Sequence, residues 1–527
     1  MRSPLSLSFS HQKNEMKGPA SRALVFGWQR TILVVVLAFY VLRRSPFCPS
    51  QSTADAKDEA TRALELARLA NAAAAPKALP APPRLTSSAV CAEGAPRWPV
   101  SQVPLAVLER PLVTIITTCH DADRALLVET ARCVLAQTSL SWEWVVVDDF
   151  SIDARALASL HGLDPRIRLV RSADFVRGSR GNLGRARNVG AGVARGEFIV
   201  FIDADDLMEP TAIEKWLYFL AAHPDAHFVN GYTRGFGAFE YDWPRSFNPS
   251  LVFREENQVA VTSMHRRASF SAIGGFPVRE GGLEDWELWF RYAAAGMWGG
   301  TVPEFLFWYR RRNSHSDRWG DFGAGGTARF QAQMRDLFPA LMSNESKWPP
   351  PPLAVAVAQG LDIAASVLNR SRWPPLGGAG CSGKSVRIAE AFAIPRAAEG
   401  PRLLLLIDRM KSGMHDSEAL ATIKTLLSRR WHVSVIALER GDDTAEQHFR
   451  SATPDLLVLA NLALPGSFPY IIFAAIYMRQ PQVVLVGGML AGAIVTSLRQ
   501  SHADITFLQL DEQHSLAEAQ PMSMKIN

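Results

Sequence analysis

The stretch "FIVFIDADD", residues 198–206, constrains the fold of this chain more than any other feature. Five apolar residues, from Phe198 to Ile202, are followed at once by Asp203, Asp205 and Asp206. A run this apolar is typical of a strand buried on both faces of a sheet. Carboxylates next to a core are costly unless cationic or polar groups meet them. The sequence therefore predicts a buried strand that ends at a polar site.

The same pattern occurs twice more upstream. "PLVTIITTCHD" and "WEWVVVDDFS" are apolar runs that end in polar residues, the second in Asp148 and Asp149, and "RIRLVRS" is a further strand pattern. Segments with helical spacing separate these runs, one of them the small-residue stretch "GRARNVGAGVARG". Strands that alternate with helices predict an α/β fold with a mostly parallel sheet. Ligands bind beyond the carboxyl ends of such strands, where all of these acids fall.

Composition narrows the class of protein. The chain has 527 residues, 48% of them hydrophobic and 20% charged, which is typical of a globular protein with several domains. Its net charge of +5 is modest, and no dense Lys/Arg run is present, so we expect no nucleic-acid partner. The five cysteines form no CxxC pair, which argues against a structural zinc site.

The first hundred residues predict a membrane anchor and a stem. Residues 31–42 are uncharged and mostly apolar, and extended back to Ala23 the segment reaches about twenty residues, the length of a bilayer-spanning helix, with Gln29 and Arg30 as interruptions. Most nearby basic residues precede it, so we expect a cytosolic tail at 1–22 and a lumenal remainder. A cleaved signal peptide, a transit peptide and a buried helix are the alternatives. Residues 43–109 are rich in Ala and Pro and are interpreted as a stem.

Two α/β segments follow the stem. The first spans 110–340, and a Pro-rich linker with two glycosylation sequons, at Asn344 and Asn369, occupies 341–400. From 401 to 527, strand patterns such as "PRLLLLID", "HVSVIALE" and "PQVVLVGG" alternate with helix patterns. We therefore expect a second, partial doubly wound domain.

The acids after the fourth strand suggest metal and sugar chemistry. Asp203 and Asp205 stand at i and i+2, so one can bind a hard cation while the other accepts a hydrogen bond from a sugar hydroxyl. Mg²⁺ and Mn²⁺ favour one or two protein carboxylates together with phosphate oxygens. The alternative is a helix cap, since Asp205 or Asp206 can cap a helix that starts near Pro210.

Other polar residues have a functional and a structural interpretation. Asp149 can accept from a base N–H or a ribose hydroxyl, or it can close a turn. Arg187, beside Asn188, can pair with a diphosphate, or it can lie on a solvated helix face. His315, within "WYRRRNSHSDRW", can complete a metal site or bind diphosphate, or it can be structural.

Glu284 and Asp285 precede "WELWFR" and are expected at a helix N-terminus, where the helix dipole favours carboxylates. As a functional residue, such an acid is a general base that takes a proton from a sugar hydroxyl, a role that needs positioning more than a large pKa shift. If its role is structural, the acid caps the helix.

Together these pieces resemble the family 2 glycosyltransferases of GT-A fold over about 110–320. The matching pieces stand in the family's order: "VTIITTCHD", "VVVDDFS", "GRARNVGAGVARGEFIVFIDADD", "SMHRRASFSAIGGFPV" and "GGLEDWELWFRYAAAG". The resemblance implies an enzyme that transfers a hexosyl or N-acetylhexosaminyl unit from a nucleotide sugar, with inversion and with Mn²⁺ or Mg²⁺. It implies these roles: Thr117, Asp149, Arg187 and Asn188 at the nucleotide, Asp203 at ribose or metal, Asp205 and His315 at the metal, Asp285 as base and Glu284 near the acceptor.

The chain departs from the family pattern in three places. Cys119 and His120 stand where a Pro-Thr-Tyr-Asn-like turn is usual, and the register of His315 differs from the commoner Tyr-Arg-x-His. The Gln-x-x-Arg-Trp motif of processive synthases is absent, so we expect one transfer per binding event.

Residues 401–500 resemble the N-terminal half of a family 4 glycosyltransferase of GT-B fold. The glycine-rich turn after the first strand is degraded to "KSGMHD", and the second half, which holds most of the donor site in such enzymes, does not follow before Asn527. We expect this domain to be catalytically silent, as an acceptor-binding or docking module.

The leading hypothesis is a type II membrane enzyme of the Golgi or endoplasmic reticulum. It would use a nucleotide sugar, UDP-linked by family frequency, and a glycan or glycoconjugate acceptor. A non-catalytic carbohydrate-binding or scaffold protein and a nucleotidyltransferase are the competing hypotheses. The paired acids speak against the first alternative, and "TTCHDADR" lacks the basic Gly-rich loop of the second.

Overall fold

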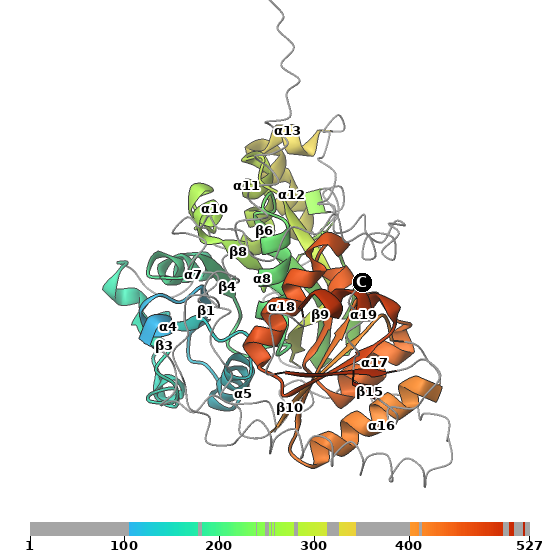
Figure 1. Cartoon of the computed structure of the whole chain (residues 1–527). Helices are drawn as coiled ribbons and strands as arrows, with labels where there is room; N and C mark the ends of the chain where they lie inside the picture. The colour runs from blue at the N-terminus through green and yellow to red at the C-terminus, as the bar shows by residue number, and fades with distance from the viewer. Residues whose placement is uncertain are drawn as a thin grey trace, which may run out of the picture.

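The structure is a computed structural model (Figure 1) that describes residues 105–177, 182–238, 240–247, 252–253, 256–257, 259–278, 283–312, 326–343, 401–410, 414–498, 505–510 and 520–521. The expected membrane helix, the stem, most of the linker and His315 lie outside these residues. Within the described ranges, no helix combines the length and the apolar character that a membrane span requires.

The four predicted strands of the first segment form one parallel array. They are β1 (Val113–Cys119), β2 (Trp142–Asp148), β3 (Ile167–Arg171) and β4 (Phe198–Phe201), in the spatial order β3-β2-β1-β4. Their pairing is parallel throughout. The carboxyl ends of β1, β2 and β4 therefore meet at one edge of the sheet, as the sequence predicts.

Beyond β4 the sheet continues with mixed pairing. Antiparallel β8 (Met264–Arg266) joins β4 to β6 (Phe228–Gly237), and β6 pairs in parallel with β9 (Gly299–Arg311). The short strands β5 (Leu207–Met208) and β7 (Tyr241–Trp243) pair antiparallel with β9 and β6. This part of the sheet brings the C-terminal end of β9 close to the acids that follow β4.

Helices cover both faces of the sheet. Along β1, Ile115 and Ile116 point to opposite faces and belong to different buried clusters. Helix α7 (Leu183–Gly192) packs on the Ile116 face. A Cβ placed at Gly190 would lie 2.5 Å from Ile116 Cγ2, so this helix needs glycine there, and the predicted face of small residues is confirmed.

The other helices of this segment have the following bounds: α4 (Leu105–Glu109), α5 (Arg124–Leu135), α6 (Arg155–Ala158), α8 (Ala212–Ala222), α10 (Arg267–Ala272), α11 (Glu284–Ala294), α12 (Gly326–Leu337), α13 (Pro339–Met342) and the 3₁₀ turn η2 (Ser172–Asp174).

The C-terminal unit is a second parallel sheet, in the order β12-β11-β10-β13-β14-β15. Among the described strands of this unit, β15 alone runs antiparallel to its neighbour. This arrangement is compatible with the predicted partial doubly wound domain. Its elements are β10 (Arg402–Ile407), α16 (Met414–Ser428), β11 (His432–Ala437), α17 (Asp443–Ala452), β12 (Leu456–Val458), the 3₁₀ turns η6 (Leu459–Asn461) and η7 (Pro465–Ser467), α18 (Phe468–Arg479), β13 (Val483–Gly487), α19 (Met489–Leu498), β14 (Thr506–Leu510) and β15 (Gln520–Pro521).

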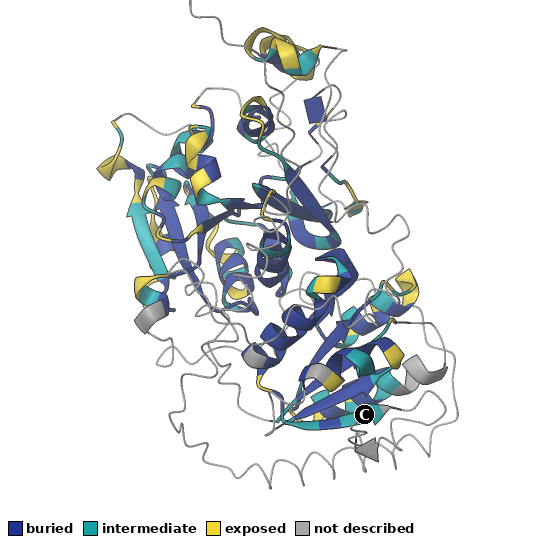
Figure 2. Cartoon of the chain, turned by 45° about the horizontal axis from the view of Figure 1, so that its top comes forward, coloured by how far each residue is buried: buried dark blue, intermediate teal, exposed yellow. Residues whose placement is uncertain are grey.

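The two units share one hydrophobic core. A single buried cluster includes Trp144 and Trp216 of the first unit together with Leu404 and Ile472 of the second. Figure 2 shows buried residues along the strands of both sheets, whereas exposed residues gather on the outer helices and loops. The burial of apolar surface between the units means that they stabilise each other.

Candidate functional site

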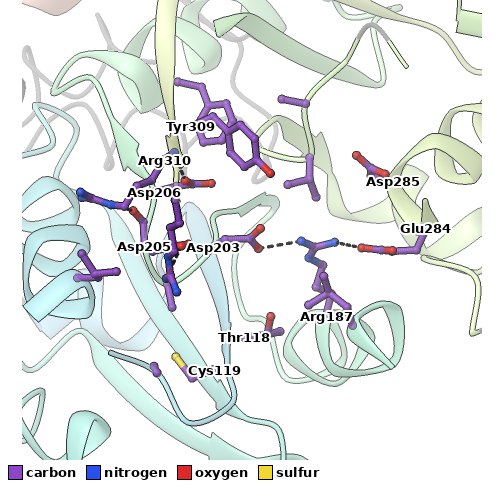
Figure 3. Close-up of a pocket in the computed structure, with 18 of the residues that line it drawn as sticks. Thr118, Cys119, Arg187, Asp203, Asp205, Asp206, Glu284, Asp285, Tyr309 and Arg310 are labelled. Atoms are coloured by element: carbon purple, nitrogen blue, oxygen red, sulfur yellow. Dashed lines mark hydrogen bonds and ion pairs between the residues drawn. The ribbon is translucent and has the colours of Figure 1, made fainter. Parts of the chain in front are cut away.

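A cavity of about 360 Å³ opens where β1 and β4 end (Figure 3). This volume is within the usual range of small-molecule sites. The cavity is lined by five residues that the sequence singles out for function: Arg187, Asp203, Asp205, Glu284 and Asp285. They come from α7, from the turn after β4 and from the start of α11, so the tertiary fold brings together residues nearly a hundred positions apart.

Arg187 bridges the two acidic parts of the cavity. Its Nη2 donates to Asp203 Oδ1 at 2.8 Å, and its Nη1 donates to Glu284 Oε1 at 2.7 Å (Figure 3). Burial lowers the pKa of the Arg187 guanidinium, but the charges of Asp203 and Glu284 outweigh that effect and raise it. Arg187 is therefore a permanent buried cation, and the interpretation as part of a solvated helix face is wrong.

Asp285 stands in the first turn of α11, as predicted. Its Oδ2 accepts a hydrogen bond from Asn257 Nδ2 at 2.9 Å, and its Oδ1 accepts from the backbone N–H of Trp286 at 2.8 Å. Burial and the neighbouring charge of Glu284 raise the pKa of Asp285 to about 7. Leu283, the residue just before α11, has a left-handed backbone with φ of 58°. Such strain in a branched residue is typical of functional sites.

The acids after β4 are held by the end of β9. Arg310 donates from its backbone N–H to Asp206 Oδ1 at 2.7 Å and from its Nε to the Asp205 carbonyl oxygen at 2.7 Å. The guanidinium of Arg312 forms an ion pair with the Asp205 carboxylate. Helix α8 has Thr211 at its N-cap, without a side-chain cap bond. The alternative that Asp205 or Asp206 caps this helix is therefore wrong.

The cavity holds more carboxylate than its cations neutralise. Burial raises the pKa of Asp205, and the charge of Asp203 adds to the effect, while Arg312 opposes it. Burial, followed by the charges of Asp205 and Asp203, raises the pKa of Asp206 well above its usual value. Each raised pKa marks a carboxylate whose ionised form an additional cation would stabilise.

The donor set fits Mg²⁺ or Mn²⁺ only together with a ligand. Asp203 and Asp205 supply hard carboxylate oxygens, but among the described residues no group of three or more His, Cys, Asp or Glu side chains is arranged to hold a metal ion. A metal here would need phosphate or water oxygens to complete its shell, which is the usual situation for Mg²⁺ at phosphate sites. The predicted third ligand, His315, lies outside the described residues.

Three predicted nucleotide-binding residues, Thr117, Asn188 and Asp149, are not among the described residues that line the cavity. Thr117 is fully buried, and its Oγ1 accepts from Trp144 Nε1 at 2.9 Å, whereas the next residue, Thr118, lines the cavity. Asn188 uses its side chain on the backbone of Phe276, donating to the carbonyl oxygen and accepting from the N–H, both at 2.9 Å. Asn188 therefore positions a loop beside Arg187.

Asp149 lies in a loop pair beside the cavity. Its N–H donates to the Cys119 carbonyl oxygen at 2.7 Å, and its own carbonyl oxygen is 2.9 Å from His120 Nδ1. The carboxylate atom Oδ1 is buried and finds no hydrogen-bond partner in the part of the chain that the structure describes. An unpaired carboxylate oxygen can accept a hydrogen bond from a ligand N–H. The contact of Asp149 with a base therefore stays a prediction, and its free Oδ1 atom supports it.

Cys119, the departure from the family pattern, is a free buried thiol at the end of β1. Burial, followed by the charges of Asp148, Asp203 and Asp205, raises its pKa. The thiol stays protonated and is unsuited to nucleophilic chemistry.

Sequence reasoning missed several residues of the cavity wall. Arg310 and Arg312 line it from the end of β9, beside Tyr309, and Trp243 and Asn257 line it from other segments. The stretch "WYRRRN" was available as a signal, because Arg310 and Arg312 stand two apart where a strand ends, a spacing that places side chains on one face of an extended chain. For Asn257 and Trp243, the sequence contains no comparable pattern.

Comparison with known proteins agrees with this arrangement. Residues 114–279 match the model of the glycosyl transferase family 2. The chain is 31% identical over 290 residues to the O-antigen biosynthesis protein RfbC of Myxococcus xanthus, which covers 52% of this chain and 21% of that protein. It is 27% identical over 208 residues to the putative glycosyltransferase EpsE of Bacillus subtilis, covering 37% of this chain and 72% of that protein.

A third relative is the putative teichuronic acid biosynthesis glycosyltransferase TuaG of Bacillus subtilis, 32% identical over 126 residues, with 24% of this chain and 48% of that protein covered. A solved structure of S. aureus TarS 1-349 in complex with UDP-GlcNAc aligns with a TM-score of 0.33 and 17% identity, over 38% of this chain and 59% of that one. The chain spans about a fifth of the length of RfbC and of an uncharacterized Sinorhizobium fredii protein that it also matches. Residues 114–279 are thus a glycosyl transferase family 2 domain, as predicted.

Proposed function

We propose that this chain is a metal-dependent, inverting glycosyltransferase that moves a hexosyl or N-acetylhexosaminyl unit from a UDP-sugar to a hydroxyl of a glycan or glycoconjugate. One observation carries the proposal. A single cavity holds the acids after β4 on one side and Asp285 on the other, with Arg187 between them (Figure 3). The match of residues 114–279 to the family 2 model supports the same class of reaction.

The donor would lie along the ends of β1, β4 and β9. Arg310 and Arg312 bring positive charge to the wall beside Asp205, where a diphosphate would lie. The free Oδ1 of Asp149 suits a base N–H, and Asp203 suits a ribose hydroxyl. When bound at Asp203 and Asp205, Mn²⁺ or Mg²⁺ would supply Lewis-acid stabilisation of the charge that develops on the leaving diphosphate.

Asp285 would act as the base. A carboxylate with a pKa of about 7 is substantially ionised at neutral pH, yet basic enough to accept a proton. It would take the proton of the acceptor hydroxyl while the acceptor oxygen attacks the anomeric carbon from the side opposite the diphosphate. Arg187 pairs with both Glu284 and Asp203, so Glu284 would fix the start of α11 relative to Asp203. Glu284 would also lie near the acceptor. Fixed geometry of this kind supplies much of the rate in displacement reactions.

We further propose that the C-terminal unit does not bind a second donor. The carboxylate of Asp408 accepts from the backbone N–H groups of Leu490 and Ala491, at 3.1 and 2.7 Å, in the first turn of α19. A helix N-terminus beside a parallel sheet is where such folds bind phosphate, and here a side chain already occupies it. Residues 23–42 would anchor the enzyme in a Golgi or endoplasmic reticulum membrane, with the catalytic domain in the lumen.

The test is a panel of nucleotide sugars with Mn²⁺, assayed for hydrolysis and for transfer to simple glycosides. Wild-type protein is expected to be active, and to lose activity with a chelator. Asp205→Ala and Asp285→Asn are expected to be inactive, with nucleotide binding weakened only in Asp205→Ala. A folded wild-type protein that binds no nucleotide sugar in the presence of metal would contradict the proposal and favour a non-catalytic carbohydrate-binding protein.

A further inference from the structure

Arg450 extends from helix α17 of the C-terminal unit to two strands of the first unit. Its Nη1 lies 3.2 Å from Glu209 Oε1, and its Nη2 forms an ion pair with Glu304 Oε2. Glu209 directly follows β5, and Glu304 lies within β9. One guanidinium therefore connects both strands from outside the catalytic domain.

Charged residues of the candidate donor site stand directly before β5 and at the end of β9. The two strands pair with each other through Leu207 and Met208 of β5. At the cavity, Asp206, just before β5, accepts from the backbone of Arg310 near the end of β9. The strand pair is thus fixed by Asp206 and Arg310 at one end and by Arg450 at the other.

Glu304 depends on the C-terminal unit for its charge balance. Its side chain is only 1% exposed. Its Oε1 accepts from Asn461 Nδ2 at 2.7 Å, and its Oε2 lies 2.8 Å from Lys215 Nζ, in addition to the ion pair with Arg450. Without Arg450, Lys215 would be the one cation among the described residues left to compensate both Glu209 and Glu304, so one of these buried carboxylates would lose its counter-charge and the strand pair would be held less firmly.

We propose that Arg450 is a positioning residue of the donor site: the C-terminal unit holds the β5–β9 pair so that Asp205, Arg310 and Arg312 keep the geometry that binds a nucleotide diphosphate. The inference rests on the proposed function for the identity of the ligand. It assigns the C-terminal unit a role inside the catalytic cycle of the first unit, in place of independent acceptor binding.

Arg479 provides a matched control in the same interface. Its Nη1 and Nη2 donate to the two carboxylate oxygens of Glu214, both at 2.9 Å, and it also pairs with Asp455. Glu214 lies on α8, and its other partners among the described residues, Thr138 and Tyr218, do not line the cavity. Loss of Arg479 therefore breaks a comparable buried pair between the units without touching β5 or β9.

The experiment compares the full-length wild type with Arg450→Gln, Arg450→Lys and Arg479→Gln. UDP binding with Mn²⁺ is measured by calorimetry, kcat and KM by donor hydrolysis, and stability by thermal unfolding. We expect both glutamine variants to lower Tm. Only Arg450→Gln should weaken UDP binding and lower kcat/KM, by roughly tenfold to a hundredfold, the loss that small misplacements at a site produce. Arg450→Lys should restore part of the binding.

Amide hydrogen exchange supplies a readout that needs no ligand. Arg450→Gln should accelerate exchange in residues 205–209 and 304–311, whereas Arg479→Gln should not. The inference is overturned if the two glutamine variants weaken UDP binding equally at equal loss of Tm, or if exchange in these segments is unchanged in Arg450→Gln. If the wild type binds no UDP, the result contradicts the proposed function and not the positioning role of Arg450. In that case the hydrogen-exchange data by themselves decide whether Arg450 positions the strand pair.

Discussion

At the scale of single residues, Arg187 is the connection on which both halves of the cavity depend. Its two donors hold Asp203 and Glu284 at 2.8 and 2.7 Å, and its side chain is only 4% exposed. Without this cation, two partly buried carboxylates face each other unpaired. Arg187→Gln should therefore lower the free energy of unfolding by about 3 kcal/mol or more, as for other broken buried ion pairs.

Denaturant unfolding of Arg187→Gln and Arg187→Lys checks this prediction. A lysine has one ammonium group and cannot donate in two fixed directions, so Arg187→Lys should recover less than half of the loss. Arg185→Gln, two positions away on α7 and outside the cavity lining, is the control and should have a smaller effect. If Arg187→Lys recovered all of the lost free energy of unfolding, the positive charge alone would stabilise the site, and the two directed hydrogen bonds to Asp203 and Glu284 would not contribute.

Asp285 makes the pH dependence of the reaction predictable. A general base works only when ionised, and the pKa of Asp285 lies at about 7. We therefore expect kcat/KM to fall as the pH falls below about 7, and Asp285→Asn to lower kcat by roughly a hundredfold to ten-thousandfold at higher pH. A rate profile for donor transfer between about pH 5 and 9 measures both.

The same shift has a consequence for stability. The folded pKa of Asp285 is raised above its unfolded value, so the carboxyl favours the folded state at low pH, and this contribution is lost as the pH rises through about 7. In Asp285→Asn this pH-dependent loss should disappear. Thermal unfolding of both proteins at mildly acidic and mildly basic pH checks it, and an unchanged pH dependence would show that Asp285 does not titrate in this range.

At the scale of elements, the position of α7 depends on one glycine. A Cβ at Gly190 would meet Ile116 at 2.5 Å and Val147 at 3.1 Å, so Gly190→Ala should push the helix off the sheet and destabilise the protein by about 1–3 kcal/mol. Arg187 lies on the same helix, so nucleotide binding should weaken as well. Both are measured by denaturant unfolding and calorimetry.

Gly192 is the matched control on the same helix. No atom of the residues that the structure describes lies within 4 Å of a Cβ placed there, so Gly192→Ala should leave stability unchanged or raise it by up to about 1 kcal/mol through helix propensity. Equal effects of the two substitutions would mean that packing against Ile116 does not position α7.

At the scale of the whole molecule, the buried charges between the units should make the fold sensitive to acid. Burial raises the pKa of Glu304, but Lys215 and Arg450 outweigh that effect and lower it to about 2. A depressed folded pKa means that this carboxylate stabilises the fold above its unfolded pKa of 4.5, and that the stabilisation is lost as the pH falls toward 2.

Glu304→Gln should remove that acid-dependent loss and lower stability at neutral pH, because Lys215 and Arg450 would remain buried with one carboxylate fewer between them. Unfolding followed by tryptophan fluorescence at several pH values measures both effects. Because one core spans both units, wild-type protein should unfold in a single transition, and two well-separated transitions would contradict this view of the interface.

Much of the first unit was predictable because its signals are local. Strands β1, β2 and β4 are short apolar runs with a polar end, and Glu284 begins a helix where the dipole favours acids. Arg310 and Asn257 were not predictable in this way, because their roles depend on strand pairing and loop placement that no short pattern encodes. Thr117 shows the limit of motif matching. Neighbouring residues of a strand point to opposite faces, so a shift of one position moves a side chain from the cavity into the core.

The sequence by itself determined the positions of the parallel strands along the chain, the acids at their ends and the family that residues 114–279 match, because hydrophobic periodicity and a strand followed by carboxylates are properties of neighbouring residues. Only the tertiary structure decided which charges meet: Arg187 between Asp203 and Glu284, and Arg450 between Glu209 and Glu304. Ion pairs between distant segments depend on distance and burial, and these quantities exist only once the sheets have packed.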